Sequence, residues 1–168
     1  LAESFLRLIE PWQCDVTVVR RTGEPLPGAT RTVTAEQRFA AVGDADAVVV
    51  CLALTPETTG IVDRELLAAM PDDCWLLNVG RGLHVRNADL LAALDAATIG
   101  GAVLDVTDPE PLPDGHPLWA YDNVLITPHV GNTPEMGLPL LAARVEENVR
   151  RWLRGDELLG GVDVDAGY

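Results

Sequence analysis

The sequence contains no lysine, since all 12 of its basic residues are arginine. A Schiff-base mechanism and a P-loop phosphate cradle each need a lysine, so neither can be built from these 168 residues. The chain also lacks any apolar run of membrane-spanning length. We therefore expect a globular protein with no membrane partner.

Positive charge and cysteine are both scarce. The 12 basic residues stand against 26 acidic ones, and the formal net charge is −14 at pH 7. Nucleic acids bind through clustered positive charge, so we expect no nucleic-acid partner. The cysteines Cys14, Cys51 and Cys74 are odd in number and lack C-x-x-C or metal-ligand spacing. They are expected to be reduced, partly buried thiols in a cytoplasmic protein, with no metal site.

Short apolar segments, rich in β-branched residues, alternate with amphipathic segments along the chain. The apolar segments predict strands at 15–20, 46–54, 74–79, 101–106 and 123–127. The amphipathic segments predict helices at 2–11, 35–42, 63–70, 87–97 and 134–154, the third and fourth capped by Asp63 and Asn87. This alternation predicts an α/β fold in which the strands lie parallel in one sheet with helices on both faces. The tail 161–168 alternates like a strand but has no evident partner.

Three short blocks follow predicted strands, namely 78–82, 104–111 and 127–131. They bring an arginine, Arg81, a carboxylate, Glu110, and a histidine, His129, to the same end of the predicted sheet. An arginine fork can hold the carboxylate of a 2-oxo or 2-hydroxy acid, a histidine can move its proton, and an anion can orient that histidine. Taken singly, Arg81 is as well explained by an ion pair, Glu110 by an exposed loop and His129 by a structural role.

The same blocks resemble the D-isomer-specific 2-hydroxyacid dehydrogenases, a family that includes glyoxylate/hydroxypyruvate reductases and phosphoglycerate dehydrogenases. Cys51–Thr58 is similar to the family's C-P-L-T-x-E-T turn, and Leu77–Gly82 to its N-x-x-R-G block. Leu104–Pro111 is similar to its D-V-x-x-x-E-P block, and Ile126–Gly131 to its T-P-H-x-G block. Four motifs in family order cover nearly the whole chain. The resemblance implies a Rossmann-type doubly wound parallel sheet that binds NAD(P).

The resemblance also implies a role for each motif residue. Hydride passes between the nicotinamide and C2 of the substrate, while His129 donates or removes the proton on the substrate oxygen. Glu110 would bond the other ring nitrogen, fixing the tautomer and favouring the imidazolium, and Arg81 would bind the substrate carboxylate or carbonyl. The implied cofactor-binding set is Arg20, Arg21, Cys51, Leu52, Ala53, Thr58, Val79, Gly80, Arg81, Asp105, His129, Gly131 and Asn132, with Asp105 on the nicotinamide side and Cys51 on the adenosine side. We also expect a homodimer.

The end of the predicted strand at 15–20 indicates which cofactor is used. An NAD enzyme places an acidic residue there to bind the ribose 2′-hydroxyl, whereas this chain has Arg20 and Arg21. Two guanidinium groups suit a 2′-phosphate, which favours NADP(H) over NAD. The alternative is that one arginine only stacks on the adenine.

The sequence contains no G-x-G-x-x-G turn, and it begins at the helix that such a turn would precede. We therefore expect a portion of a longer protein. In this interpretation residues 1–150 are a partial NAD(P)-binding domain, and 151–168 return to a catalytic domain outside the sequence. The chain departs from the usual family pattern at Ala53, Arg86, Thr107 and Asn132, which affects turn rigidity and substrate shape more than the chemistry.

Two other classes of function fit the same residues. A non-catalytic dinucleotide sensor or corepressor could keep all three catalytic residues, and turnover of NADPH with 2-oxo acids would separate it from an enzyme. A degraded remnant would bind no cofactor even in the full-length protein. His84 and His116 belong to no motif and are expected at the surface.

Overall fold

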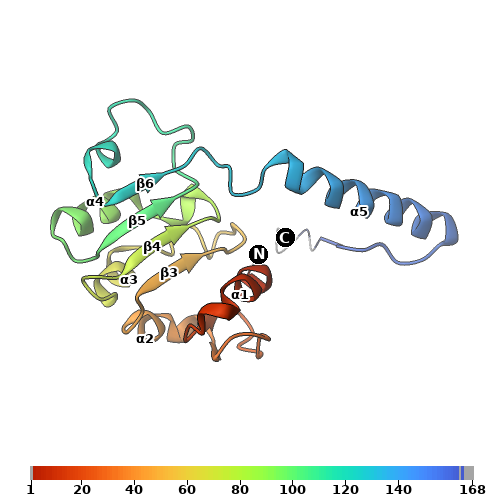
Figure 1. The fold of residues 1–168 in the computed structure, drawn as a ribbon, viewed down its shortest axis with the longest axis horizontal. Helices are drawn as coiled ribbons and strands as arrows, with labels where there is room; N and C mark the ends of the chain where they lie inside the picture. The colour runs from red at the N-terminus through yellow and green to blue at the C-terminus, as the bar shows by residue number, and fades with distance from the viewer. Residues whose placement is uncertain (1, 163, 165–168) are drawn as a thin grey trace.

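The computed structural model describes residues 2–162 and 164 (Figure 1). The strands are β1 (Thr17–Val19), β2 (Arg31–Val33), β3 (Ala47–Val50), β4 (Trp75–Asn78), β5 (Gly101–Leu104) and β6 (Val124–Ile126). The α-helices are α1 (Ala2–Ile9), α2 (Arg38–Val42), α3 (Arg64–Ala69), α4 (Asn87–Asp95) and α5 (Pro134–Arg154). Short 3-10 helices are η1 (Glu10–Trp12), η2 (Ala35–Gln37), η3 (Gly82–His84) and η4 (Pro117–Ala120).

Two parallel sheets form from these strands. The larger has four strands in the order β3-β4-β5-β6, and the smaller pairs β1 with β2. The four strands lie in register, so that Val50, Asn78, Leu104 and Ile126 form one row at their carboxyl ends. The mixed α/β class and the parallel pairing are therefore as predicted.

The expectation of a single sheet with helices on both faces was wrong. In the doubly wound order 3-2-1-4-5-6 the first strand is central, and β2-β1 and β3-β4-β5-β6 correspond to the parts on either side of it. No such central strand is present among the described residues, so the two parts stay separate sheets.

The hydrophobic core lies on one face of the larger sheet. It gathers side chains such as Val50, Leu76 and Leu104 from the strands and Leu67 and Leu90 from α3 and α4. The residues adjacent to these in the strands, such as Val49, Leu77 and Val103, point to the other face of the sheet and are partly exposed. Leu125 of β6, on that same face, is 57% exposed. Right-handed crossovers that step in one direction across a sheet place their helices on the same face, which explains the one-sided core.

Local signals explain where most elements begin and end. Asp63 caps α3 as predicted, its Oδ1 accepting from the Leu66 N–H at 3.0 Å. The predicted cap Asn87 was wrong: α4 begins at that residue, Arg86 precedes it, and the Asn87 amide instead donates to the Asp108 carbonyl. Helix α1 ends at Ile9, two residues before the end of the predicted range 2–11, and Pro11 lies inside η1.

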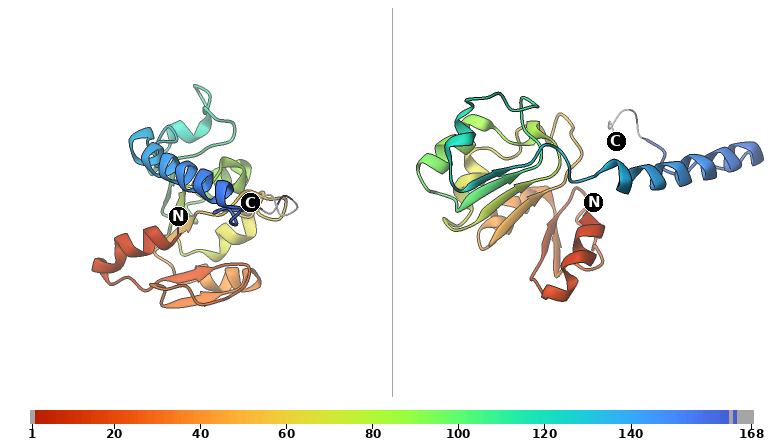
Figure 2. Two further views of the ribbon diagram at one scale, coloured as in Figure 1. Left: turned by 90° about the vertical axis from the view of Figure 1, so that its right-hand side faces the viewer. Right: turned by 45° about the horizontal axis from the view of Figure 1, so that its top comes forward.

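Helix α5 spans the range predicted from its periodicity, 134–154, and projects away from the sheet (Figures 1 and 2). None of its residues is buried, and apolar side chains such as Leu141 and Trp152 are 58% and 71% exposed. Within the part of the chain that the structure describes, no helix combines the length and the apolar character needed to cross a membrane. Most of the predicted strand-like tail at 161–168 lies outside the described residues.

Candidate active site

Four loops leave the carboxyl ends of β3 to β6 at one edge of the larger sheet. They are the 51–60 turn, the 79–84 loop, the 105–112 loop and the 127–133 loop. Because the preceding strands are parallel and in register, the loops begin side by side. The structure thus places Arg81, Glu110 and His129 at the same sheet edge.

Glu110 and His129 form a direct pair across two of these loops. Oε1 of Glu110 lies 2.7 Å from Nδ1 of His129. The other carboxylate oxygen accepts from the Thr107 backbone N–H at 3.3 Å. The side chains of His129 and Glu110 are 45% and 42% exposed, so both remain accessible to a ligand. Nδ1 is occupied, which leaves Nε2 as the ring nitrogen for proton exchange.

The pair sets the charge of Glu110. The hydrogen bond from His129 is the main reason that the pKa of Glu110 lies below its ordinary value of 4.5. Burial acts in the opposite direction, while the Thr107 N–H and the positive charge of Arg81 add to the lowering. Glu110 is therefore an anion at neutral pH, able to orient the imidazole but not to donate a proton.

Asp105 organises the loop that carries His129. Its Oδ1 accepts from the Thr127 hydroxyl at 2.6 Å and the Val130 N–H at 2.9 Å, and its Oδ2 accepts from the Gly131 N–H at 2.9 Å. His129 itself has φ 55°, in the left-handed region that residues with a side chain rarely adopt. The carboxylate thus holds a conformation that the histidine would not favour on its own. A bond from Asp105 to a cofactor remains a prediction.

Hydrogen bonding dominates the electrostatics of Asp105 as well. Burial alone would raise the pKa of this carboxyl, but the bonds from Thr127, Gly131 and Val130 and the nearby His129 hold it below 3.8. Because the pKa is lowered in the folded state, the stabilisation is fully present above pH 3.8 and is lost as the pH falls below it through the folded-state value.

We expect Asp105→Asn to lower the free energy of unfolding by about 1–3 kcal/mol. The amide nitrogen of asparagine is a donor, so one of the backbone N–H groups that now bond to Asp105, of Val130 or Gly131, would lose its acceptor. Urea denaturation of the full-length protein at neutral pH measures this. Asp122→Asn, at an exposed position before β6, is the matched control and should change stability little. Equal effects of the two changes would contradict the role of Asp105.

The backbone of Arg81 is fixed by two buried polar side chains. Asn78 accepts from the Gly80 N–H at 3.1 Å and donates to the Arg81 carbonyl at 2.9 Å. His84 accepts from the Arg81 N–H at 3.0 Å. The expectation of a surface position for His84 was wrong, since it is 0% exposed. Its spacing of three residues from Arg81 is the only signal in the sequence that pointed to it.

Gly82 marks the closest approach of two loops. A Cβ added at this position would lie 2.0 Å from the Thr107 carbonyl oxygen and 2.6 Å from the Asp108 nitrogen. Only glycine allows the backbone of the 79–84 loop to pass this close to the loop that carries Glu110. The loops that carry Arg81 and Glu110 are therefore held together by direct backbone contact.

Thr58 closes the 51–60 turn. Its hydroxyl donates to the Ala53 carbonyl at 2.7 Å and accepts from the Thr55 N–H at 2.8 Å. These bonds shape the turn although Ala53 replaces the usual proline. Cys51, at the start of the turn, is half-buried, and burial raises its pKa, so it is a neutral thiol rather than a nucleophile.

Apolar side chains are exposed along the same edge. Leu52, Val79 and Val130 are 37%, 39% and 50% exposed. Val130 was not predicted, although its place between His129 and Gly131 could have indicated it. Gly131 is tied to Asp105, and Asn132 lies near Gly137, whose added Cβ would be 3.3 Å from the Asn132 amide nitrogen.

Arg20 and Arg21 lie apart from this group. They follow β1 of the smaller sheet, where Nη1 of Arg20 donates to the Glu24 carbonyl at 3.3 Å. Arg20 is half-buried and Arg21 is exposed. They therefore follow a strand of a different sheet from the one that carries Arg81, Glu110 and His129.

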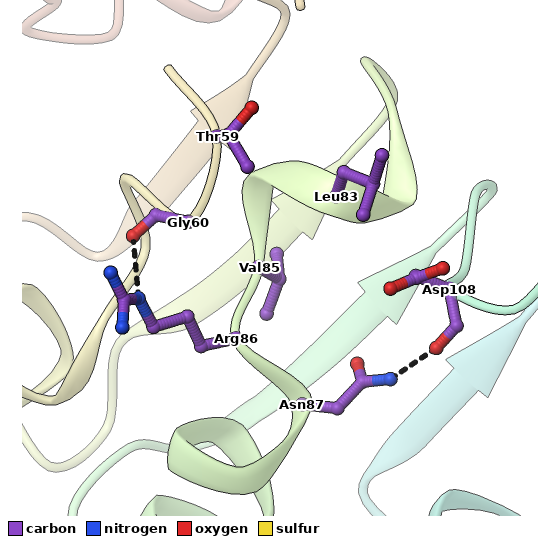
Figure 3. Close-up of a pocket in the computed structure, with 7 residues that line it drawn as sticks. All are labelled: Thr59, Gly60, Leu83, Val85, Arg86, Asn87 and Asp108. Atoms are coloured by element: carbon purple, nitrogen blue, oxygen red, sulfur yellow. Dashed lines mark hydrogen bonds between the residues drawn. The ribbon is translucent and has the colours of Figure 1, made fainter. Parts of the chain in front are cut away.

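A hollow of about 270 Å³ lies between the 51–60 turn, η3 and the start of α4. It is lined by Thr59, Gly60, Leu83, Val85, Arg86, Asn87 and Asp108 (Figure 3). Arg86 donates to the Gly60 carbonyl at 3.3 Å, and Asn87 reaches the Asp108 carbonyl on the other side. The polar groups of the hollow thus brace neighbouring loops against α4.

Comparison with known families identifies the region as a whole. Residues 1–131 match the family described as D-isomer specific 2-hydroxyacid dehydrogenase, NAD binding domain. An uncharacterised protein in the proB 3′ region of Corynebacterium melassecola is 42% identical over 164 residues, which cover 98% of this chain and 54% of that protein. The chain therefore spans about half the length of this curated relative.

Solved structures are similar over nearly the whole chain. A D-isomer specific 2-hydroxyacid dehydrogenase from Xanthobacter autotrophicus Py2, in complex with NADPH and MES, is 41% identical with a TM-score of 0.82, covering 92% of this chain and 63% of that one. An NADPH-dependent glyoxylate/hydroxypyruvate reductase from Sinorhizobium meliloti, in complex with NADP and sulfate, is 32% identical with a TM-score of 0.91, covering 100% of this chain and 54% of that one.

Proposed function

The chain belongs to the D-isomer specific 2-hydroxyacid dehydrogenase family, and on this premise we propose that the full-length protein transfers a hydride between NADP(H) and a small 2-oxo or 2-hydroxy acid. The observation that carries the proposal is the Glu110–His129 pair, 2.7 Å apart at the sheet edge where such folds bind their ligands. Arg81, whose backbone is anchored by Asn78 and His84, supplies the cationic group that the reaction requires.

In this proposal His129 is the acid and base of the reaction. During reduction its Nε2 gives a proton to the substrate's keto oxygen, and during oxidation Nε2 takes the proton back. Glu110 accepts from Nδ1–H, so that the proton exchanged with the substrate is the one on Nε2. Asp105 holds the backbone of His129 in its left-handed conformation, and this conformation keeps the imidazole directed at Glu110.

Arg81 binds the substrate. Its guanidinium is a planar donor fork that matches a carboxylate, and a bond of this charged type contributes about 1.5–3 kcal/mol. The backbone on both sides of Arg81 is anchored by Asn78 and His84, so the side chain starts from a fixed point. A fixed arginine and a fixed histidine orient C2 of the acid between them.

The chain's own residues fit a dinucleotide. Half-exposed Leu52, Val79 and Val130 offer an apolar surface for a flat ring. At Gly131 an added Cβ would fall 2.8 Å from Oδ2 of Asp105, so glycine allows the backbone of the 127–133 loop to lie against this carboxylate. The nicotinamide, when bound, supplies or accepts the hydride.

Turnover by the full-length protein tests the proposed function. NADPH oxidation should be followed with glyoxylate, hydroxypyruvate and pyruvate, and we expect at least one to be reduced to its D-2-hydroxy acid or, for glyoxylate, to glycolate. NADPH binding with no oxidation by any of the acids would favour a non-catalytic dinucleotide sensor. Absence of binding would favour a remnant and would overturn the proposal.

The cofactor preference is a further part of the proposal. We expect the full-length protein to prefer NADPH, and Arg20→Asp to lower kcat/KM for NADPH by about 10- to 100-fold, since a bond to a charged group contributes about 1.5–3 kcal/mol. An aspartate would repel the 2′-phosphate and accept from a ribose hydroxyl. Arg31→Asp, the same charge change at the amino end of β2, is the control and should leave the preference intact. A wild-type preference for NADH would contradict this assignment.

We further propose the setting in which the protein works. Residues 1–150 would form part of the NAD(P)-binding domain, and 151–168 would lead back to a substrate domain. The exposed apolar side chains of α5 support a homodimer, because surfaces of this kind are usually covered in the working assembly. Cys14, Cys51 and Cys74 are all unpaired, which fits the cytoplasm. Sedimentation equilibrium of the full-length protein should give the mass of a dimer.

A further inference from the structure

His84 is buried between the 51–60 turn and the 79–84 loop, and both of its ring nitrogens are engaged. Nδ1 lies 3.0 Å from the backbone nitrogen of Arg81. Nε2 lies 3.3 Å from the carbonyl oxygen of Ala53. The ring is 0% exposed, so water cannot replace either partner. One side chain thus bridges the loop that carries the substrate-binding arginine and the turn assigned to the cofactor.

The partners determine which nitrogen carries the hydrogen. The Arg81 N–H can only donate, so Nδ1 must accept and carries no hydrogen. The Ala53 carbonyl can only accept, so Nε2 must carry the hydrogen and donate. Both bonds exist together only in the neutral Nε2–H tautomer. The imidazolium would place an N–H of the ring against the N–H of Arg81.

Gly80 makes room for the ring. A Cβ at this position would lie 2.9 Å from Nδ1 and 3.0 Å from Cε1 of His84. The glycine before Arg81 therefore allows the imidazole to lie close to the backbone of the loop. Two features of the loop suit the imidazole of His84: Gly80 has no side chain, and the backbone N–H of Arg81 points at Nδ1. The fold therefore specifies the position of the ring.

We propose that His84 is a positioning residue that holds Arg81 and the cofactor turn in a fixed relation through its two ring nitrogens. The proposal rests on the function proposed above. Its Nδ1 bond serves the substrate side, because it fixes the peptide from which the Arg81 side chain extends. Its Nε2 bond serves the cofactor side, because it fixes the carbonyl of Ala53 near the start of the 51–60 turn.

Amide side chains can separate the two bonds. In His84→Asn the amide oxygen comes near the position of Nδ1, so the Arg81 bond is kept and the Ala53 bond is lost. In His84→Gln the amide nitrogen comes near the position of Nε2, so the Ala53 bond is kept and the Arg81 bond is lost. His84→Phe removes both bonds with a ring of similar shape.

The expected result in the full-length protein is a crossed pattern. His84→Gln raises KM for the 2-oxo acid about tenfold with little change in the Kd of NADPH, because a buried N–H loses its acceptor. His84→Asn weakens NADPH binding more than it raises KM for the acid, and His84→Phe affects both. A role in stability alone would lower Tm in all three variants and leave both constants unchanged. That result, or identical effects of Asn and Gln, would overturn the proposal.

A measurement on the wild-type protein covers the case in which the variants fail to fold. Nitrogen-15 spectra of sequentially assigned histidines distinguish the two neutral tautomers and the imidazolium. We expect the Nε2–H tautomer for His84 at neutral pH, and either other form would overturn the proposal. If the wild type reduces no 2-oxo acid, the proposed function fails on its own, while the tautomer and the Kd of NADPH still test His84.

Discussion

His129→Ala is expected to reduce kcat of the full-length protein by about 10²–10⁴-fold, the usual contribution of a general acid or base. The affinity for NADPH should change little, because among the described side chains the imidazole bonds only to Glu110, and alanine removes that one bond. Alanine also leaves the Asp105 bonds to Val130 and Gly131 in place. Steady-state kinetics together with NADPH titration by fluorescence separate the two quantities.

His116→Ala is the matched control for the loss of a histidine. His116 lies outside the four loops of the site, where its Nδ1 accepts from the Leu118 N–H at the start of η4. Its removal should cost some stability and leave kcat nearly unchanged. If His129→Ala weakened NADPH binding as much as it lowered kcat, His129 would be a structural residue and the acid/base assignment would be wrong.

Gly82→Ala is expected to have the largest structural effect of any single methyl group in the site. The new Cβ would lie 2.0 Å from the Thr107 carbonyl oxygen. Neither loop can retreat easily, since each begins at a paired residue, Asn78 in β4 and Leu104 in β5. Overpacking of this kind costs about 1–3 kcal/mol or more, and the displaced 105–112 loop would carry Glu110 away from His129. Urea denaturation and kcat of the full-length protein both report it.

Gly43→Ala tests whether any added methyl has the same effect. Gly43 ends α2 with φ −70°, and the nearest atoms to an added Cβ are 3.8 Å away, an ordinary contact. This variant should fold and turn over like the wild type. Normal stability and kcat for Gly82→Ala would mean that the two loops can move apart, and would contradict a site held by backbone contact.

The alternation of apolar and amphipathic segments predicted most of the elements, because burial of one face imposes a regular spacing, but it missed strand β2 (Arg31–Val33). Helix α5 occupies the predicted range 134–154, and β4 to β6 lie inside their predicted segments. The arrangement was less predictable. Nothing within the segment 15–20 indicates which strand will be its neighbour, because its pairing with β2 rather than with the larger sheet depends on residues elsewhere in the chain.

The site divides in the same way. Arg81, Glu110 and His129 were predicted from three blocks that follow apolar strands and from the order of the family motifs, and the structure pairs Glu110 with His129 at 2.7 Å. The buried His84 was misjudged because burial of a polar ring depends on partners distant in sequence, here Ala53, 31 positions earlier. Asp105 showed a related limit: its position at a strand end was visible, but its three hydrogen bonds to 127–131 were not.

Strand β3 has a practical consequence for anyone who expresses this sequence. It stands at the end of its sheet, and on that side the described residues supply no neighbour. Its residues Ala47–Val50 are all apolar and carry no charge or proline that would discourage another chain from adding to it. A protein consisting of residues 1–168 alone should therefore self-associate through the β3 edge and precipitate as its concentration rises. Failure of such a protein to bind NADPH would then reflect its low solubility rather than a lack of cofactor recognition.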